Sequence, residues 1–365
     1  MAATVKVGIV GCGNVSNQYL HNLKTFDILE VKSLTDVDMG KAAARASEFN
    51  LQAVTLGELL SDRQIQIVVN LTVPSAHAEV SLQIINAGKN TYSEKPLALT
   101  RTDGRRILDA AREKGVLVGC APDTFLGGGL QTCREVIDAG WIGSPVAATA
   151  FFATHGPESW HPNPQFFYKP GAGPVFDLGP YMLTALVSLF GPARRVTSSA
   201  HISFPERQIL SQPFYGSQIK VEVPTHVAGV IDFSSGVVAS VITSFDIWHS
   251  SQPNIEIFGT EGTLIMPGPN KFTGPVRIRR AAEDHWSEIP LSGNPQAGRG
   301  IGIADLACAL IHSRKPRASG DLAYHVLDLM HAIIEASDSG QHVIVESSCE
   351  RPEPLPHGPC PQEPD

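Results

Sequence analysis

The first third of the chain alternates short apolar runs with segments whose apolar residues recur every three or four positions. Residues 5–10, 29–35, 65–73, 91–93 and 116–120 are apolar runs of the length and β-branched content typical of strands. Residues 15–23, 40–49, 76–87 and 102–114 have helical composition or periodicity. Strands that alternate with helices of this length predict βαβ units, and therefore a doubly wound parallel sheet of the α/β class.

The pattern changes after about residue 124. Helical segments are predicted at 130–139 and 178–190, and most of 196–280 reads as strands. Residues 227–233 and 237–245, joined by Ser-Ser-Gly, predict a hairpin, as do residues 256–258 and 263–266. Helical periodicity returns at 303–311 and 322–336. This half of the chain predicts an α+β domain in which a mostly antiparallel sheet carries helices on one face.

Length and composition fit two folded domains. The chain has 365 residues, and domains average about 150 residues. It is 42% hydrophobic and 18% charged, which excludes general disorder. We place the domains at residues 1–124 and 125–348. The last 17 residues, 349–365, contain six prolines and are expected to form an extended, disordered tail.

Charge and cysteine usage limit the partners. The formal net charge is −8, which argues against a nucleic-acid surface because phosphate binding needs clustered Lys and Arg. No apolar run reaches the roughly 18 residues of a membrane span, and the first residues lack a secretory signal. The six cysteines are scattered and form no C-x-x-C pair. We therefore expect reduced thiols, a cytoplasmic location and no membrane partner.

The first strand is followed by a glycine motif for a dinucleotide. Gly11 and Gly13 allow a tight turn and a close approach of the backbone to a pyrophosphate at the start of a helix. Asp36 ends the second strand 20 residues after Ser16, at the offset where a carboxylate meets the adenine ribose. The alternative is an ordinary strand–helix turn with an exposed aspartate. In this context we favour the cofactor interpretation.

Asp36 also favours NAD over NADP. A carboxylate accepts hydrogen bonds from the ribose 2′-hydroxyl and repels a 2′-phosphate. Val37 follows, so no arginine is placed to neutralise that phosphate. Asp38 either adds to the repulsion or caps the next helix.

Two further positions carry candidate chemistry. Lys95 follows a short strand and precedes Pro96, at the edge of a parallel sheet where ligands bind, although most lysines are solvated surface residues. Asp177 and Tyr181 are four residues apart, so on a helix they share one face. The alternative is that Asp177 caps a helix and Tyr181 is a core aromatic.

A proline-rich segment at 154–164 carries residues suited to a polyol. Trp160 offers an apolar ring to a sugar face, and His161 and Asn163 offer polar groups to hydroxyls, although a rigid structural loop fits equally well. Trp248 and His325 are weaker candidates, since a histidine on a helix is more often a satisfied core residue. No H-E-x-x-H and no cysteine–histidine cluster indicates a metal.

Several motifs together resemble the Gfo/Idh/MocA oxidoreductases. They are Gly11-Cys12-Gly13, Val73-Pro74-Ser75-Ala76-His77, Ala87-Gly88-Lys89, Glu94-Lys95-Pro96-Leu97 and the run from Gly171 to Tyr181. The resemblance spans about residues 5–346. It implies a Rossmann domain, then an α+β domain whose large open sheet serves a homodimer or homotetramer. The cofactor-binding set is then Gly11, Gly13, Asn14, Val15, Asp36, Thr72, Pro74, His77, Glu94 and Lys95.

The resemblance also implies site roles. Lys95 contacts the nicotinamide and the reacting group, and its bond to Pro96 is often cis. Asp177 binds substrate, and Tyr181 stands where most relatives have a catalytic histidine, as in a branch resembling dihydrodiol dehydrogenases and keto-sugar reductases. A phenol has an ordinary pKa near 10, which a nearby ammonium would lower. The residues themselves, apart from the resemblance, add His155, Trp160, His161, Trp248 and His325 to the expected substrate site.

We therefore expect an NAD-dependent oxidoreductase acting on a carbinol carbon of a sugar, cyclitol or related vicinal diol. Two alternatives stay open. One is an enzyme that oxidises a sugar transiently, eliminates across the glycosidic bond and regenerates NAD. The other is a non-catalytic dinucleotide or sugar sensor, against which the presence of both Lys95 and Tyr181 argues.

Overall fold

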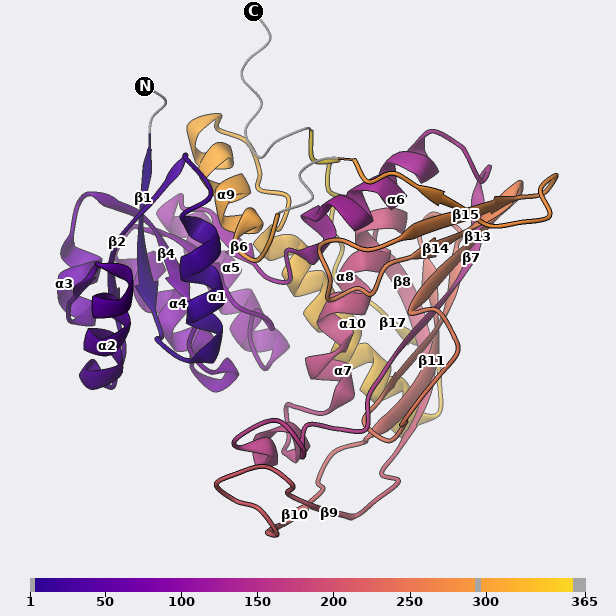
Figure 1. Ribbon diagram of the computed structural model, residues 1–365, viewed down its shortest axis with the longest axis horizontal. Helices are drawn as coiled ribbons and strands as arrows, with labels where there is room; N and C mark the ends of the chain where they lie inside the picture. Colours follow the sequence, from indigo (N-terminus) through magenta and orange to yellow (C-terminus); the bar gives the residue numbers. More distant parts are fainter. Residues whose placement is uncertain (1–3, 293–296, 357–365) are drawn as a thin grey trace, which may run out of the picture. The chain divides into compact units, whose positions relative to one another are not determined.

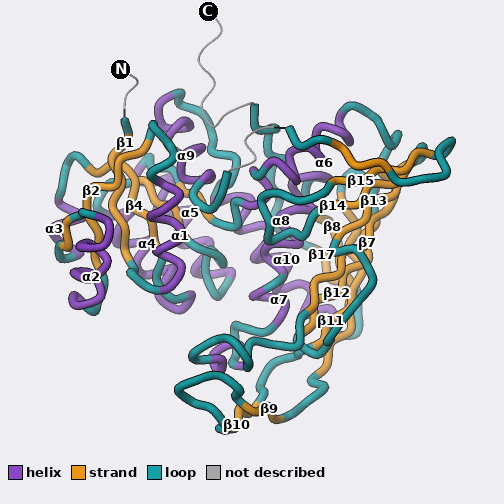
Figure 2. The backbone as a smooth tube through the Cα atoms, in the orientation of Figure 1, coloured by secondary structure: helices purple, strands orange, loops and turns teal. Residues whose placement is uncertain are grey.

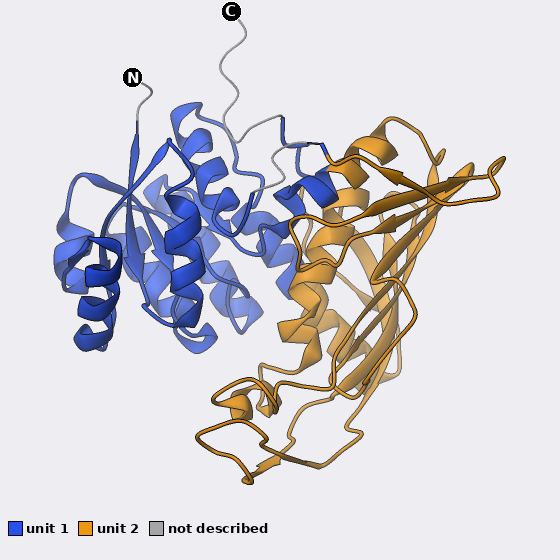
Figure 3. Ribbon diagram, viewed as in Figure 1, with its two compact units in different colours: residues 1–131, 292–327, 352–365 blue, residues 132–291, 328–351 orange. Residues whose placement is uncertain are grey.

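The chain divides into two compact units. A computed structural model describes residues 4–292 and 297–356. Unit 1 comprises residues 1–131, 292–327 and 352–365, and unit 2 comprises residues 132–291 and 328–351 (Figure 3). This division differs from the predicted boundary at residue 124, because residues 292–327 group with the first unit and not with the second.

Unit 1 is built on a parallel sheet. Within the described residues the sheet has six strands in the order β3-β2-β1-β4-β5-β6. All five neighbouring pairs are parallel, as the alternation of strands and helices predicted. The strands are β1 (Val5–Val10), β2 (Leu29–Thr35), β3 (Gln52–Ala53), β4 (Ile65–Asn70), β5 (Asn90–Ser93) and β6 (Val118–Cys120).

Helices connect these strands. In Figure 1 α1 lies in front of the sheet, and α5 is drawn fainter behind it. Apart from the short β3 and α3, every element agrees with the sequence pattern to within a few residues. The connecting helices are α1 (Asn14–Leu23), α2 (Met39–Phe49), α3 (Leu56–Ser61), α4 (His77–Asn86) and α5 (Arg101–Lys114), with short 3-10 turns η1 (Pro74–Ala76) and η2 (Thr124–Leu126). After β6, α6 (Gly128–Asp138) begins in unit 1 and continues into unit 2 from residue 132.

The segment after residue 297 completes unit 1. The Asp123 carboxylate is fully buried, and its Oδ2 accepts hydrogen bonds from the backbone N–H groups of Gly300 (2.8 Å) and Gly302 (3.0 Å) at the start of α9 (Ile301–Ile311). Gly119 of β6 forms a bridge with Ser319. Periodicity predicted these helices correctly but holds no information on which sheet they join.

Unit 2 contains a larger, mixed sheet. Within the described residues it has nine strands in the order β16-β15-β14-β13-β7-β12-β11-β8-β17. They are β7 (Pro145–Ala153), β8 (Ala193–His201), β11 (His226–Phe233), β12 (Val238–Ser244), β13 (Ile255–Gly259), β14 (Gly262–Met266), β15 (Val276–Arg280), β16 (Ser287–Ile289) and β17 (Val343–Ile344). Both predicted hairpins, β11–β12 and β13–β14, are present and antiparallel. The central β7 pairs parallel with β12.

Helices cover one face of this sheet, as predicted. In Figure 1, α7 (Pro174–Asp177), α8 (Gly179–Phe190) and α10 (Gly320–Ser339) lie along one side, and no helix among the described residues lies along the other. Every residue of α8 is buried. Figure 2 shows a long loop between β8 and β11 that carries the short pair β9 (Glu206–Gln208) and β10 (Gln218–Lys220). A 3-10 turn, η3 (Pro164–Tyr168), precedes α7.

The first residues of the predicted disordered tail form an ion pair and a hydrogen bond with the folded units. Arg351 forms an ion pair with Asp138 at 2.7 Å, and the Leu355 N–H donates to the Gln131 side chain at 2.7 Å. Residues 349–356 are therefore extended, as expected, but bonded to the fold. The rest of the predicted tail, 357–365, lies outside the described residues.

Asp123 provides a test of how unit 1 is completed. Asp123→Ala leaves two buried N–H groups without an acceptor, and we expect the free energy of unfolding to fall by about 2–4 kcal/mol. Asp123→Asn keeps an acceptor oxygen and should cost less. Urea denaturation measures both variants, and an alanine variant as stable as the native protein would contradict the assignment.

Candidate functional site

The loop between β1 and α1 has the form of a diphosphate cradle. Gly11 has a φ of +102°, and a Cβ there would lie 2.6 Å from the backbone carbon and oxygen of Leu71. Gly13 has an ordinary φ of −71°, and a Cβ there would meet no atom within 4 Å. No side chain caps α1. The open space at Gly13 and the uncapped helix end fit a dinucleotide phosphate group.

The Asp36 carboxylate is held at the edge of the same loop. Its Oδ2 accepts from the Cys12 N–H at 2.7 Å, and its Oδ1 accepts from the Asp38 N–H at 2.9 Å. Each oxygen has a second lone pair for a ribose hydroxyl. Asp38 caps α2 by accepting from Gly40 and Lys41, which settles its role as a cap.

A cation that no sequence motif indicates lies near Cys12, the residue whose N–H donates to Asp36. Arg45, on α2, lies close enough to Cys12 to act on the Cys12 thiol. Burial and the Asp36 charge outweigh that effect and raise the pKa of Cys12 to about 11. Arg45 Nη1 is bonded to Glu48 at 2.6 Å, so its charge is already partly compensated.

The loops after β4 and β5 are joined by a buried histidine. His77 is 1% exposed, with Nδ1 2.7 Å from the Pro96 carbonyl oxygen and Nε2 3.0 Å from that of Thr72. Burial lowers its pKa. The Asn70 amide donates to the His77 carbonyl at 3.0 Å. His77, expected to bind cofactor, therefore positions the loop that carries Thr72 and Pro74.

Glu94 lies in the loop directly after β5 and is also buried. It is 8% exposed, and its carboxylate accepts from the Tyr19 hydroxyl (2.8 Å) and the Lys95 N–H (2.9 Å). Arg299 lies 3.6 Å from the same carboxylate. The Lys95–Pro96 peptide is cis, and Lys95 is partly exposed. Glu94 fixes the backbone from which Lys95 projects.

In unit 2, Asp177 and Tyr181 flank the junction of α7 and α8. Asp177 is the last residue of α7, and Tyr181 lies in the first turn of α8. The cap positions belong to Gly173 and Leu178, so Asp177 is not a helix cap. Tyr181 is 6% exposed and packs edge-to-face against Phe152, with ring centroids 6.4 Å apart. Its burial is that of a core aromatic.

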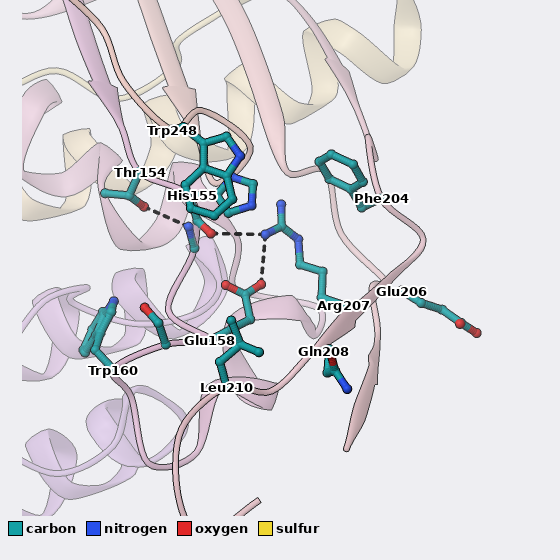
Figure 4. Close-up of a pocket in the computed structure, with 12 residues that line it drawn as sticks. Thr154, His155, Glu158, Trp160, Phe204, Glu206, Arg207, Gln208, Leu210 and Trp248 are labelled. Carbon is teal, nitrogen blue, oxygen red and sulfur yellow. Dashed lines mark hydrogen bonds and ion pairs between the residues drawn. The ribbon is translucent and has the colours of Figure 1, made fainter. Parts of the chain in front are cut away.

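Three of the predicted substrate residues line one pocket of unit 2. His155, Trp160 and Trp248 surround a cavity of about 560 Å³ (Figure 4). His161 does not line it. His161 lies near Asp177, whose charge favours the imidazolium, but burial outweighs that effect and lowers the pKa of His161. The Trp160 and His161 rings meet edge-to-face with centroids 5.4 Å apart. Trp160 lines the pocket and His161 lies near Asp177, so this ring contact connects the pocket to Asp177.

His325, expected as a substrate-site residue, is fully buried. It lies within α10 and is 0% exposed, as is common for a helical histidine with a satisfied core environment.

A buried cluster of charged side chains around Arg207 lies at the pocket and was not predicted from the sequence. Arg207 donates to Glu158 at 2.9 Å, to the Phe245 carbonyl at 2.9 Å and to Asp246. Tyr168 donates to the same Glu158 carboxylate at 2.5 Å. Glu158 and Asp246 lie 49 and 39 residues from Arg207 along the chain, so no local spacing signals the cluster.

The described part of the chain offers neither a metal cluster nor a membrane-spanning helix. No group of three or more His, Cys, Asp or Glu side chains there is arranged to hold a metal ion. None of its helices is both long and apolar enough to cross a membrane.

Comparison with known proteins places the chain in a family. Residues 5–121 match the oxidoreductase family with an NAD-binding Rossmann fold, and residues 130–265 match the GFO/IDH/MocA C-terminal domain. Inositol 2-dehydrogenase 3 of Saccharopolyspora erythraea is 30% identical over 293 residues, covering 78% of this chain and 80% of that protein. The chain belongs to the Gfo/Idh/MocA family. It is thus an oxidoreductase with an NAD-binding domain, as the motifs predicted.

Other Gfo/Idh/MocA proteins align along nearly the whole chain. The 1,5-anhydro-D-fructose reductase of Ensifer adhaerens is 27% identical over 358 residues, covering 93% of this chain and 98% of that protein. The structure of a levoglucosan dehydrogenase with NADH and L-sorbose superposes with a TM-score of 0.80 at 21% identity, covering 94% of this chain and all of that one. This likeness confirms the predicted fold of a parallel sheet followed by a mixed, mostly antiparallel sheet.

The two glycines of the first loop should respond differently to alanine. Gly11→Ala collides with the Leu71 backbone at a left-handed φ, so both thermal stability and NADH binding should fall. Gly13→Ala meets no protein atom, so stability should be nearly native while NADH binds at least about tenfold more weakly. Thermal melts and NADH titration measure the pair. Native NADH affinity in Gly13→Ala would contradict the cradle assignment.

Proposed function

We propose that this protein transfers a hydride between NAD and a carbinol carbon of a sugar, cyclitol or related vicinal diol or keto-sugar. The observation that carries the proposal is Lys95, held by Glu94 at the carboxyl end of β5 beside the loops that fit a dinucleotide. A sugar-like substrate is supported by the relatives, which are named anhydrofructose reductase and inositol dehydrogenase.

The chain's own residues have distinct proposed roles. When bound, the nicotinamide supplies the hydride acceptor or donor. Lys95 has three N–H donors to orient the reacting hydroxyl and stabilise negative charge on its oxygen. Tyr181, as its phenolate, takes the hydroxyl proton as the carbon loses its hydride and the carbonyl forms, and the resulting phenol returns that proton during reduction. Asp177 accepts a hydrogen bond from a neighbouring substrate hydroxyl.

Residues of unit 1 are proposed to bind the adenine half of NAD. Asp36 accepts hydrogen bonds from the ribose hydroxyls, while its charge disfavours a 2′-phosphate. Val37 is fully exposed next to it and offers apolar contact to the base. Gly11, Gly13, Asn14 and Val15 hold the diphosphate, with Thr72 and Pro74 from the loop after β4.

A homo-oligomer is proposed through the helix-free face of the unit 2 sheet. Val230 of β11 and Val238 of β12 are exposed on these strands, at 37% and 42%. Apolar side chains on an uncovered sheet favour contact with a second copy. Sedimentation measures the assembly state.

We expect NAD to bind at least about tenfold more tightly than NADP, a difference of about 1.4 kcal/mol. Asp36→Ser should shrink that preference because the repelling carboxylate is removed. Asp38→Ser removes the same charge from the neighbouring cap and should leave the preference nearly unchanged. Titration with NADH and NADPH measures all three proteins. Equal affinities in the native protein would remove the assigned role of Asp36.

Tyr181→Phe removes one oxygen and leaves the ring against Phe152, so the fold should persist. We expect turnover to fall by about 10²–10⁴-fold, with NAD binding unchanged. Lys95→Ala should be comparably damaging, Lys95→Arg should not restore activity, and the double variant should be little worse than either single one. Tyr215→Phe, at an exposed tyrosine, is the matched control.

The assay follows absorbance at 340 nm together with products for a panel of sugars and cyclitols. Near-normal turnover in Tyr181→Phe would assign the proton transfer to another group. Glycoside cleavage without net NADH would instead indicate transient oxidation and elimination.

A further inference from the structure

The pocket of unit 2 has an aromatic wall open to solvent. The His155 and Trp248 rings stack with centroids 3.4 Å apart and planes 14° apart, and Phe204 meets the His155 ring edge-to-face at 6.4 Å. Trp248 is nevertheless 70% exposed. Figure 4 shows His155 and Trp248 together on one side of the pocket and Trp160 on another. The imidazole covers one face of the Trp248 indole, and the remaining exposure of this side chain leaves apolar ring surface in the pocket lining.

The charges around the pocket disfavour an anion. The Arg207 guanidinium is bonded to both Glu158 and Asp246, and the Arg207 and Glu158 side chains are only 6% and 7% exposed. Glu206 adds an exposed carboxylate to the pocket lining. Burial, and then the Arg207 charge, lower the pKa of His155, so its imidazole is neutral at pH 7. Carboxylates therefore outnumber cations, and a phosphorylated or carboxylated ligand would be repelled.

Size and polarity fit one uncharged sugar ring. The cavity of about 560 Å³ lies within the roughly 300–1,000 Å³ of small-molecule sites. A pyranose presents an apolar face of C–H groups and an equatorial rim of hydroxyls. The indole of Trp248 matches that face, and Gln208, Thr154 and Ser159 supply neutral hydrogen-bonding groups to the rim.

The pocket is linked structurally to the proposed reaction site. Phe167, Tyr168, Leu178 and Phe245 belong to one buried cluster, and Phe152 packs against it. Leu178 directly follows Asp177, and Phe152 contacts Tyr181. The cluster therefore fixes the segment that carries His155 and Trp160 relative to Asp177 and Tyr181, so one ligand of two rings can be oriented by both.

We infer that this pocket is a subsite for a second, uncharged sugar ring joined to the ring that reacts. The substrate class is then glycosides and disaccharides, not free monosaccharides or sugar phosphates. This inference rests on the proposed function for the reacting ring, but the pocket itself consists only of unit 2 residues. A surface segment from a second copy of the chain is the competing occupant.

Matched substrate pairs test the inference by kinetics. The pairs are glucose with cellobiose, glucose with maltose, and myo-inositol with galactinol, and glucose 6-phosphate serves as the charged probe. We expect kcat/KM to be at least about tenfold higher for the two-ring member of the preferred pair, with the phosphate poorest. Trp248→Ala should reduce that two-ring preference about tenfold, mainly through KM. Trp286→Ala, at a 38%-exposed tryptophan outside the pocket lining, should leave it unchanged.

A binding measurement separates this inference from the proposed function. Calorimetric titration of the preferred two-ring sugar onto cofactor-free protein should give an affinity that Trp248→Ala weakens about tenfold. Binding that depends on Trp248, without turnover of any sugar, would overturn the proposed function and support the subsite. Turnover with equal preference for one and two rings in native and Trp248→Ala proteins would overturn the subsite alone. A Trp248→Ala variant that changes only its sedimentation would overturn it in favour of a subunit contact.

Discussion

One buried guanidinium organises the aromatic pocket of unit 2. Arg207 comes from the short β9, yet its hydrogen bonds reach Glu158 in the loop after β7 and Asp246 after β12. A buried charge needs compensating partners, and here three distant segments supply them to one another. Neutralising Arg207 alone would leave two carboxylates without their cation. The shape of the aromatic pocket thus depends on an ion cluster that the ligand itself need not touch.

Unit 1 uses a comparable device at its ligand-binding edge. The loops after β1, β4 and β5 carry the glycines, Thr72 and Lys95, while Asn70, His77 and Glu94 lie buried beneath them. Buried polar side chains that are fully hydrogen-bonded hold a loop in one conformation. The side chains of His77 and Glu94, two residues expected to contact the cofactor, are bonded to the backbone of these loops.

Regular elements could be predicted wherever the local pattern decides them. The β11–β12 hairpin follows from two β-branched runs around Ser-Ser-Gly, and the strands of unit 1 follow from apolar runs bounded by helix signals. The central β7 was missed because its alanines and leading proline have low strand propensity. The short α3 was not predicted, although Thr55 followed three residues later by Glu58 is the sequence signature of the capping box that begins this helix.

The candidate site residues also fall into two groups: those placed by the local chain order and those placed by tertiary packing. Gly11, Asp36 and Lys95 stand directly after strands, so their place at the sheet edge follows from the chain order. Arg45 and Arg207 matter through contacts that depend on tertiary packing, and no spacing indicates them. Likewise the burial of His325 is decided by what surrounds α10 and not by its own sequence.

The interrupted course of unit 1 has a consequence for biosynthesis. Its sheet is complete by residue 120, but the N–H groups that donate to Asp123 Oδ2 arrive only with residues 300 and 302. Domains commonly fold in order as the chain leaves the ribosome. Here the first sheet lacks these two donors to Asp123 while the uninterrupted stretch 132–291 of unit 2 is synthesised and is free to fold first. The dinucleotide-binding unit therefore begins on the ribosome before residues 132–291 of unit 2 and is completed only after them.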